Sequence, residues 1–231
     1  MMTPDPELIL LTDCHTHRIS RGAVVCVDPG DMDSVAASHP GILLSTGIHP
    51  WRLGDMTDGE FEREMETVRR SASLPGVAAI GETGLDTIRG GDLPRQQETL
   101  MRHIALSEEL SLPLVLHVVR TGHLIIGLRK RLGTSIRQPW IWHGFRGNPT
   151  QAAQFCAFPD CYISLGPDFN PKTAAAVPSD RLLTETDDAP AGIAITDVID
   201  RVAHARGCDP TELAATVGRN AQRIFLPHNN T

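Results

Sequence analysis

Eight short apolar runs recur along the chain, and most of them are continuous rather than strictly alternating in hydrophobicity. Continuous apolar runs are typical of strands that are buried on both faces, as in a parallel sheet covered by helices. The pattern therefore predicts a parallel sheet that draws its strands from the whole chain. The predicted strands span residues 8–14, 23–27, 42–46, 77–80, 114–118, 140–142, 161–165 and 182–184.

Segments with a helical spacing of apolar residues lie between many of these runs. The clearest spans residues 61–71, where Phe61, Met65 and Val68 share one face. Strands that alternate with helices form parallel βα units, and eight such strands favour a closed TIM-type (β/α)8 barrel. No repeat or linker divides the sequence, so we expect one domain over residues 1–231. The other predicted helices span residues 94–110, 124–132, 149–157, 196–205 and 209–225.

The connection between the first two predicted strands is short. Only residues 15–22 join them, whereas a parallel crossover needs about a dozen residues or more. Either the first helix of the barrel is shortened or missing, or the second strand is wrongly assigned.

Composition restricts the class of protein further. Hydrophobic residues make up 41% and charged residues 21% of the chain, which is typical of a globular protein. Five cysteines without a CxxC pair argue against a disulfide framework and a structural zinc knuckle, so we expect a reducing cytoplasm. No apolar run reaches the ~18 residues of a membrane span, and the first residues lack the basic stretch of a secretory signal.

Charge and histidine content point towards a particular chemistry. The formal net charge of -7 disfavours a broad nucleic-acid track, because such tracks need a basic surface. The chain carries ten histidines but only two lysines, Lys130 and Lys172. An acidic chain that is rich in histidine suggests metal binding.

Polar residues stand at the carboxyl ends of the predicted strands, and these ends ring the mouth of a barrel. His15 and His17 are two positions apart, so on a strand they point to the same face and can bind one ion together. Cys14 between them should point away and contribute to packing. Four imidazoles and two carboxylates suit one or two divalent cations such as Zn, Mn, Fe or Mg. The candidate ligands are His15, His17, Glu82, His117, His143 and Asp187.

Each candidate alone is a weak signal, because a single histidine in an apolar strand is more often a core residue than a ligand. Their shared position at one end of the predicted strands favours a metal site. His49 is intermediate, because it follows a strand but the sequence Gly-Ile-His-Pro can also form a tight turn. The remaining histidines lie in helices, loops or the tail, and we expect solvated side chains at His39, His103, His123, His204 and His228.

Several motifs together resemble those of the TatD family of metal-dependent hydrolases. In chain order they are DCHTH, GIHP, AIGETGLD, LPLVLH, HGF, LLTETDDAP and the closing VGRNAQRIF. The resemblance covers residues 12–225, and its most specific feature is GETGLD followed by the two histidine strands and ETD. It implies a TIM-type barrel with up to two divalent metals and Mg-dependent 3′–5′ exonuclease or DNase activity.

The same resemblance implies roles for the candidate ligands. One ion would be held by His15, His17 and Asp187, and the other by His117 and His143, with Glu82 as the bridge. Amidohydrolase relatives often use a carbamylated lysine instead, but neither lysine of this chain lies at a ligand strand end. A divalent ion lowers the pKa of water from ~15.7 towards ~7, and Asp187 can accept the proton. Glu82 and Asp187 are therefore the expected catalytic residues.

Substrate contacts are expected from a second group of residues. His49 and Arg120 are the predicted substrate-binding residues, with Arg89 or Arg146 as a further phosphate partner. The chain departs from the family pattern in this group. Arg120 lies one position late after the strand-five histidine, and Trp51 stands where the family commonly has a second histidine.

The leading expectation is phosphodiester hydrolysis at DNA or RNA ends, for which a charge of -7 implies weak, end-directed binding. A second hypothesis is hydrolysis of an amide or ester of a small metabolite, or of an aminoacyl-tRNA. A third is a metal-binding barrel without turnover, which the presence of all the ligand types disfavours. We expect neither membrane association nor an obligate protein partner.

Overall fold

A computed structural model describes residues 10–54 and 56–226. Each strand pairs in parallel with the next one along the chain, which gives a single sheet in sequence order. The predicted strands are confirmed, although the first begins only at Asp13, and residues 8 and 9 of its predicted range lie outside the described residues. The strands are β1 (Asp13–Thr16), β2 (Ala23–Cys26), β3 (Leu43–Thr46), β4 (Val77–Asp86), β5 (Leu114–Val119), β6 (Trp140–Trp142), β7 (Cys161–Leu165) and β8 (Leu182–Thr184).

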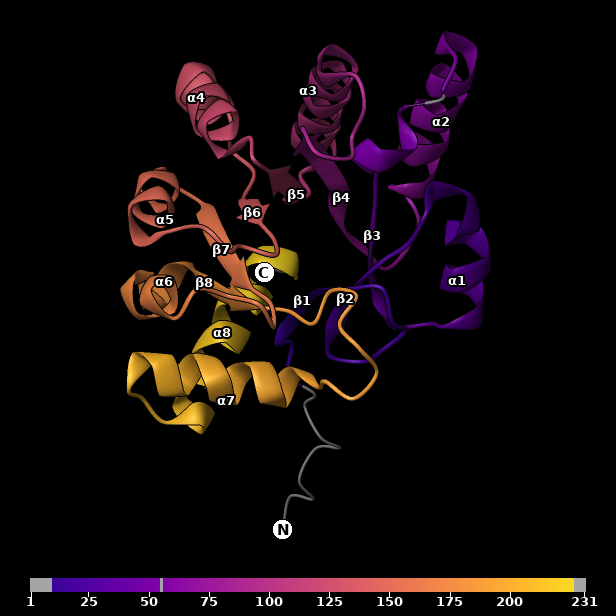
Figure 1. The fold of residues 1–231 in the computed structure, drawn as a ribbon. Helices are drawn as coiled ribbons and strands as arrows, with labels where there is room; N and C mark the ends of the chain where they lie inside the picture. Colours follow the sequence, from indigo (N-terminus) through magenta and orange to yellow (C-terminus); the bar gives the residue numbers. More distant parts are fainter. Residues whose placement is uncertain (1–9, 55, 227–231) are drawn as a thin grey trace.

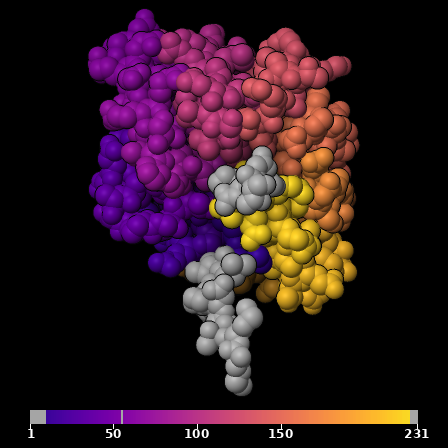
Figure 2. Space-filling view, turned by 180° about the vertical axis from the view of Figure 1, so that it is seen from behind, coloured from indigo at the N-terminus to yellow at the C-terminus, as the bar shows by residue number. Residues whose placement is uncertain are grey.

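The first and last strands meet and close the sheet into a barrel. Thr16 and Asp187 form a parallel bridge, and the hydroxyl of Thr184 donates to the carbonyl oxygen of Thr12 at 2.7 Å. Seen from behind, the indigo start and the yellow end of the described chain lie side by side (Figure 2). The predicted TIM-type (β/α)8 barrel is confirmed.

A ring of helices surrounds the strands (Figure 1). The predicted helices are confirmed to within about one turn, but α1 and α6 were not predicted, because they are short and contain few large apolar residues. None of the helices in the described part of the chain is long and apolar enough to cross a membrane. The helices are α1 (Met32–Ser38), α2 (Asp58–Ser71), α3 (Leu93–Leu110), α4 (Gly122–Leu132), α5 (Pro149–Cys156), α6 (Pro171–Ala176), α7 (Ile195–Arg206) and α8 (Pro210–Phe225).

The short first connection lacks a helix, as one of the two alternatives predicted. Residues 17–22 join β1 directly to β2, and the first helix of the ring, α1, comes only after β2. The assignment of the second strand is therefore correct. On this side, the wall of the barrel mouth is built by β2 and the start of α1.

The barrel interior is filled by a cluster that takes residues from most strands. Val24, Val115, Ile141 and Leu183 belong to it, each from a different strand. Phe225 of α8 joins the same cluster, so the C-terminal helix closes the amino-terminal end of the barrel. The carboxyl ends of the strands remain available for polar side chains.

β4 continues to Asp86, whereas its apolar pattern ends at residue 80. The added residues are mostly polar or glycine, with Leu85 as the exception, yet they are buried because they pair with β5 inside the mouth. Gly84 has a positive φ, and a Cβ at this position would collide with the carbonyl oxygen of His117. Only glycine allows β4 and β5 to approach so closely, and this approach brings Glu82 next to His117.

Candidate metal centre

The histidines of β5 and β6 reach the mouth because side chains alternate along a strand. Val115 and Ile141 point into the apolar interior. His117 and His143 lie two positions further along the chain, so they point in the same direction but at the carboxyl end. They are nearly inaccessible, with 8% and 7% exposure respectively.

Glu82 lies at the centre of the mouth, and its Oε1 faces three histidines. Oε1 lies 2.6 Å from His117 Nδ1, 2.8 Å from His143 Nε2 and 3.1 Å from His49 Nε2. These histidines come from β5, from the end of β6 and from the segment after β3. One carboxylate oxygen therefore joins three parts of the barrel.

The second oxygen of Glu82 faces the end of β1. Oε2 lies 3.1 Å from His15 Nε2 and 3.7 Å from His17 Nε2. Asp187 Oδ1 lies 3.7 Å from the same atom of His15 and 3.6 Å from that of His17. All the predicted ligands are thus brought together, and His49 joins them. We call this set the mouth cluster: His15, His17, His49, Glu82, His117, His143 and Asp187.

A clamp between β1 and the residues after β8 sets the position of the β1 side of the cluster. The Thr186 amide donates to Asp13 Oδ1 at 2.9 Å, and its hydroxyl donates to Oδ2 at 2.6 Å. Burial raises the pKa of Asp13 to about 6, against the opposing effect of these hydrogen bonds. The next residue, Asp187, has a φ of 53°, which Asp adopts more readily than most residues. Its amide donates to the carbonyl oxygen of His15 at 2.9 Å.

Two buried acids that the sequence analysis did not assign orient two of the histidines. Asp86 Oδ2 lies 3.2 Å from His117 Nε2, and Glu185 Oε1 lies 3.3 Å from His143 Nδ1. In each histidine the opposite nitrogen faces Glu82. A carboxylate that holds one imidazole nitrogen fixes the ring and makes the other nitrogen a better metal ligand. The signal was their position inside GETGLD and ETD, next to the residues that were assigned.

Asp86 is held by several donors in turn. Trp51 Nε1 donates to its Oδ2 at 2.6 Å, and the amides of Ile88 and Arg89 donate to Oδ1. Burial opposes ionisation, but these donors outweigh it and lower the pKa of Asp86 to about 2. The buried Gln96 accepts from the amide of Asp86 at 2.7 Å and fixes the end of β4. Trp51, the residue that departs from the family motif, is thus connected to the cluster.

Several groups of the mouth cluster have strongly shifted pKa values. Burial would raise the pKa of Glu82, but the charge of His143 and hydrogen bonds from neighbouring histidines lower it well below its usual range. Burial opposes protonation of His143, yet the charges of Glu82 and Glu185 raise its pKa well above its usual range. A hydrogen bond with Glu82 likewise raises the pKa of His17. The negative charge at Glu82 attracts protons, and a divalent cation can take their place.

The surroundings of His15 show whether the residues of the cluster fit a metal. Its side chain is fully buried, and neither ring nitrogen makes a hydrogen bond of acceptable geometry. Buried polar atoms without partners are rare, and a missing ion is one explanation for them. Three groups have ligand atoms within 4.8 Å of one another, and these donors fit one or two divalent cations. The groups are His15, His17, Cys26 and Glu82; His15, His143 and Asp187; and His49, Glu82 and His117.

The contacts of His49 indicate its tautomer. The amide of Trp51 donates to His49 Nδ1 at 3.1 Å, and burial lowers the pKa of His49. The neutral ring therefore carries its proton on Nε2, the nitrogen that faces Glu82. This arrangement makes His49 a hydrogen-bond donor towards the centre of the mouth.

The arginines predicted to bind phosphate lie further out. Arg120 is exposed directly after β5 and, like Arg89 and Arg146, is absent from the lining of the mouth cavity, as far as described residues go. Arg89 stacks on the Trp51 ring at 3.6 Å, and Arg146 pairs with Asp168 at 3.2 Å. Substrate binding by Arg120 stays a prediction.

The cluster opens into a cavity of about 630 Å³. Its wall includes Asp28 and Asp31, which come from the connection between β2 and α1. Arg52 also lines it, but this side chain is paired with Asp28 at 3.2 Å and with Glu64 at 2.6 Å. Outside the cluster, the described charged residues that line the cavity are Asp28, Asp31, Asp188 and Arg52, so acids outnumber bases there.

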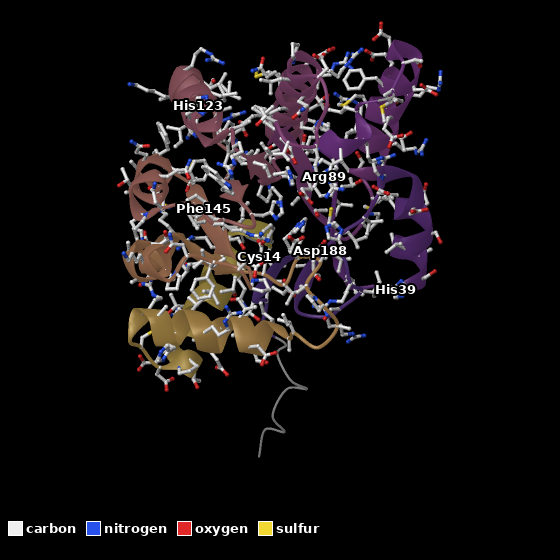
Figure 3. All side chains as sticks on the ribbon, viewed as in Figure 1. Cys14, His39, Arg89, His123, Phe145 and Asp188 are labelled. Carbon is white, nitrogen blue, oxygen red and sulfur yellow. The ribbon has the colours of Figure 1, made fainter. Side chains whose placement is uncertain are left out.

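Among the described histidines outside the cluster, all but one are exposed. His39, His123 and His204 are exposed, and Figure 3 shows His39 and His123 on the outer helices, away from the centre. The prediction for His103 is wrong, because this side chain on α3 is fully buried. His228 lies outside the described residues. Cys14 is buried in the apolar interior, in agreement with its predicted packing role.

Sequence comparison connects this site to known proteins. Residues 2–226 match the family described as TatD related DNase. The 3′–5′ ssDNA/RNA exonuclease TatD of Erwinia tasmaniensis is 31% identical over 226 residues, covering 83% of this chain and 82% of that protein. YcfH of Escherichia coli K12, named an uncharacterized metal-dependent hydrolase, is 29% identical over 225 residues, covering 88% of this chain and 82% of that protein.

Solved structures share the fold. YJJV, a TatD homolog from Escherichia coli K12, superposes with a TM-score of 0.77 at 20% identity and covers 95% of this chain and 100% of its own. A TatD family hydrolase from Entamoeba histolytica gives a TM-score of 0.74 at 17% identity, with coverage of 89% and 84%. With the sequence match extending over nearly the whole chain, this protein belongs to the TatD family of metal-dependent hydrolases.

Proposed function

We propose that this chain hydrolyses phosphodiester bonds at the ends of DNA or RNA with one or two divalent cations. The observation that carries the proposal is the position of Glu82, whose two oxygens face two separate groups of histidines. A carboxylate in this position can bridge two cations, which is the arrangement of many phosphodiester-cleaving enzymes. The exonuclease name of a relative at 31% identity supports the choice of substrate.

The ligands divide between the two oxygens of Glu82. His15, His17 and Asp187 would hold a cation near Oε2, and His117 and His143 would hold one near Oε1. A divalent cation would supply Lewis acidity, which makes water more acidic and stabilises negative charge on the substrate.

Two residues of the cluster are suited to act on the substrate. Asp187 is 26% exposed at the edge of the cluster, where its carboxylate can accept a proton from the attacking water. His49 carries its proton on Nε2 and can donate to a phosphate oxygen as negative charge develops there.

An ester or amide of a small molecule is a second candidate, and the acidic wall favours it. Asp31 and Asp188 line the cavity beside the cluster, whereas Asp28 and Arg52 form an ion pair and offset each other's charge. Such a wall repels a chain of phosphates and suits a neutral or cationic substituent. A volume of about 630 Å³ is typical of sites for small molecules.

The experiment combines elemental analysis of the purified chain with parallel cleavage assays. Labelled single-stranded DNA and RNA are incubated with Mg, Mn or Zn beside a panel of small esters. We expect stepwise shortening of the oligonucleotides with at least one of these metals. Turnover of an ester by metal-loaded protein without oligonucleotide cleavage would establish the second candidate instead.

Glu82→Gln and Glu66→Gln form a matched pair for this experiment. Glu66 is an exposed residue of α2, remote from the mouth. We expect Glu82→Gln to lose bound metal and at least about 100-fold of the activity, because both cations lose a ligand. Glu66→Gln should behave as wild type. Unchanged metal content in Glu82→Gln would contradict the assignment of Glu82.

A further inference from the structure

Cys26, the last residue of β2, faces the mouth cluster. Val24 of the same strand points into the apolar interior. Cys26 lies two positions further on, so alternation turns it to the mouth in the same way as His117 follows Val115. Its side chain lines the mouth cavity, and Sγ lies 3.9 Å from the carbonyl oxygen of Gly81.

The sulfur belongs to a compact group of potential ligands. Cys26, His15, His17 and Glu82 each offer an atom within 4.8 Å of the others. Neighbouring ligands of a tetrahedral zinc lie roughly 3.5 Å apart, as its bond lengths require. The group therefore needs only a small contraction to surround one ion. The buried nitrogens of His15, which lack hydrogen-bond partners, point to a ligand at the same place.

We propose that Cys26 is a further, thiolate ligand of the cation held by His15, His17 and Asp187 near Glu82, and that it makes this position selective for zinc over magnesium. The inference rests on the proposed metal centre. On binding, the thiol loses its proton to solvent and the sulfur bonds to the metal. Thiolate ligands favour zinc, whereas magnesium requires a shell of oxygen atoms.

In the metal-free chain, the surroundings of Cys26 keep its thiol protonated. Burial, together with the charge of Glu82, raises the pKa of the Cys26 thiol to about 12 in the metal-free chain. The sulfur is then a neutral group beside a negative carboxylate. A divalent cation reverses this situation, because a coordinating thiol is deprotonated outright.

Cobalt is the probe for the sulfur, because a thiolate bonded to Co²⁺ gives an intense near-ultraviolet charge-transfer band that imidazole and carboxylate do not give. The wild-type chain, Cys26→Ser and Cys156→Ser are titrated with Co²⁺. Cys156 is a matched control, since it is a partly buried free cysteine that does not line the cavity. We expect the band in wild type and Cys156→Ser and its loss in Cys26→Ser.

Affinity provides the second readout. Cys26→Ser should weaken zinc binding by about 10–100-fold or more and leave magnesium binding nearly unchanged. Bound cobalt without the band in wild type, or an equal zinc affinity in Cys26→Ser, would overturn the role of Cys26 but leave the metal centre intact. Failure of the wild-type chain to bind any cobalt or zinc would overturn the metal centre itself.

Protection from alkylation tests the same inference in the wild-type chain, so it does not depend on the folding of a variant. Saturating zinc should slow the modification of Cys26 by a thiol reagent at least about tenfold, as measured on the isolated peptide by mass spectrometry. Magnesium should not protect it, and the exposed Cys208 should react at the same rate throughout. Equal modification of Cys26 with and without zinc would contradict coordination.

Discussion

Two histidines of this barrel are equally buried but have opposite surroundings. His103 on α3 and His15 on β1 are both 0% exposed. His103 Nε2 accepts from the amide of Ile48 at 3.0 Å, and its Nδ1 lies 2.8 Å from the carbonyl oxygen of Thr99. His15 makes no such bonds and lies 3.1 Å from the carboxylate of Glu82.

The difference separates a residue that stabilises the fold from one that serves a site. A neutral imidazole whose two nitrogens are satisfied by the backbone can be buried at little cost. An imidazole without partners is expensive to bury, so His15 contributes nothing evident to stability in the metal-free chain. The bond from Ile48 to His103 also fixes the segment that carries His49. The structural histidine thus supports the mouth cluster from outside it.

The largest expected effect separates the two histidines directly. His15→Ala should reduce metal affinity and hydrolysis at least about 100-fold, because one ligand is lost, and it should destabilise the metal-free chain less than His103→Ala, because it leaves no backbone group unpaired. His103→Ala should lower the free energy of unfolding by about 3 kcal/mol, because it leaves a cavity and two unpaired backbone groups. Calorimetric metal titration and denaturant unfolding measure the two effects. Equal destabilisation by both substitutions would erase the distinction.

The stability of the fold should depend on pH through His103, because burial lowers the pKa of this side chain from 6.5 to about 4. Between these values the unfolded chain binds the proton and the folded chain does not, so stability rises with pH over this range. We expect the free energy of unfolding to be about 3 kcal/mol lower near pH 4 than above pH 6.5 because of His103. This stabilisation is fully present above pH 6.5 and is lost as the pH falls towards 4. Unfolding of metal-free wild type and His103→Gln over this range measures the difference. Parallel profiles for the two proteins would contradict this role of His103.

A smaller effect is expected from the carboxylate that orients His117. Asp86→Asn removes the charge that holds His117 Nε2, and we expect metal affinity to fall by about 10–100-fold. Asp33→Asn, on the exposed surface of α1, is the control. Metal titration of both variants checks the prediction, and an unchanged affinity in Asp86→Asn would limit Asp86 to a structural role.

The smallest effect is expected from the hydrogen bond that the Trp51 side chain donates to Asp86. Trp51→Phe keeps most of the ring but removes the donor to Asp86, a hydrogen bond worth about 0.5–1.5 kcal/mol. We expect a loss of metal affinity of about tenfold or less. A larger loss than in Asp86→Asn would mean that Trp51 acts through a different contact.

The architecture could be predicted from the sequence because it depends mainly on the apolar pattern of each strand, which is local. A strand buried on both faces must be apolar, so all the strands were visible as apolar runs. β4 was predicted too short, because only Leu85 among its last residues is apolar, and pairing with β5 makes these residues part of the strand. Helices α1 and α6 are short, so their pattern was too weak to identify.

The candidate site could be predicted only in part. The histidines and acids at the strand ends were found, since alternation and the barrel topology place such ends at one mouth. The orienting roles of Asp86 and Glu185 and the position of Cys26 could not be found, because each depends on a neighbour from another strand. His103 was misjudged because its burial and its bond with Ile48 depend on tertiary packing, whereas Thr99, one turn earlier on α3, is a local partner.

The sequence by itself thus determined which strands exist, that they close into a barrel, and which residues stand at its mouth. The tertiary structure alone decided which atoms meet there: the division of Glu82 between two groups of histidines, and the approach of Cys26 to one of them. The physical reason is distance along the chain. Hydrophobic periodicity is read over a few residues, whereas the hydrogen bonds and metal ligands of this site join residues that only barrel closure brings within a few ångströms.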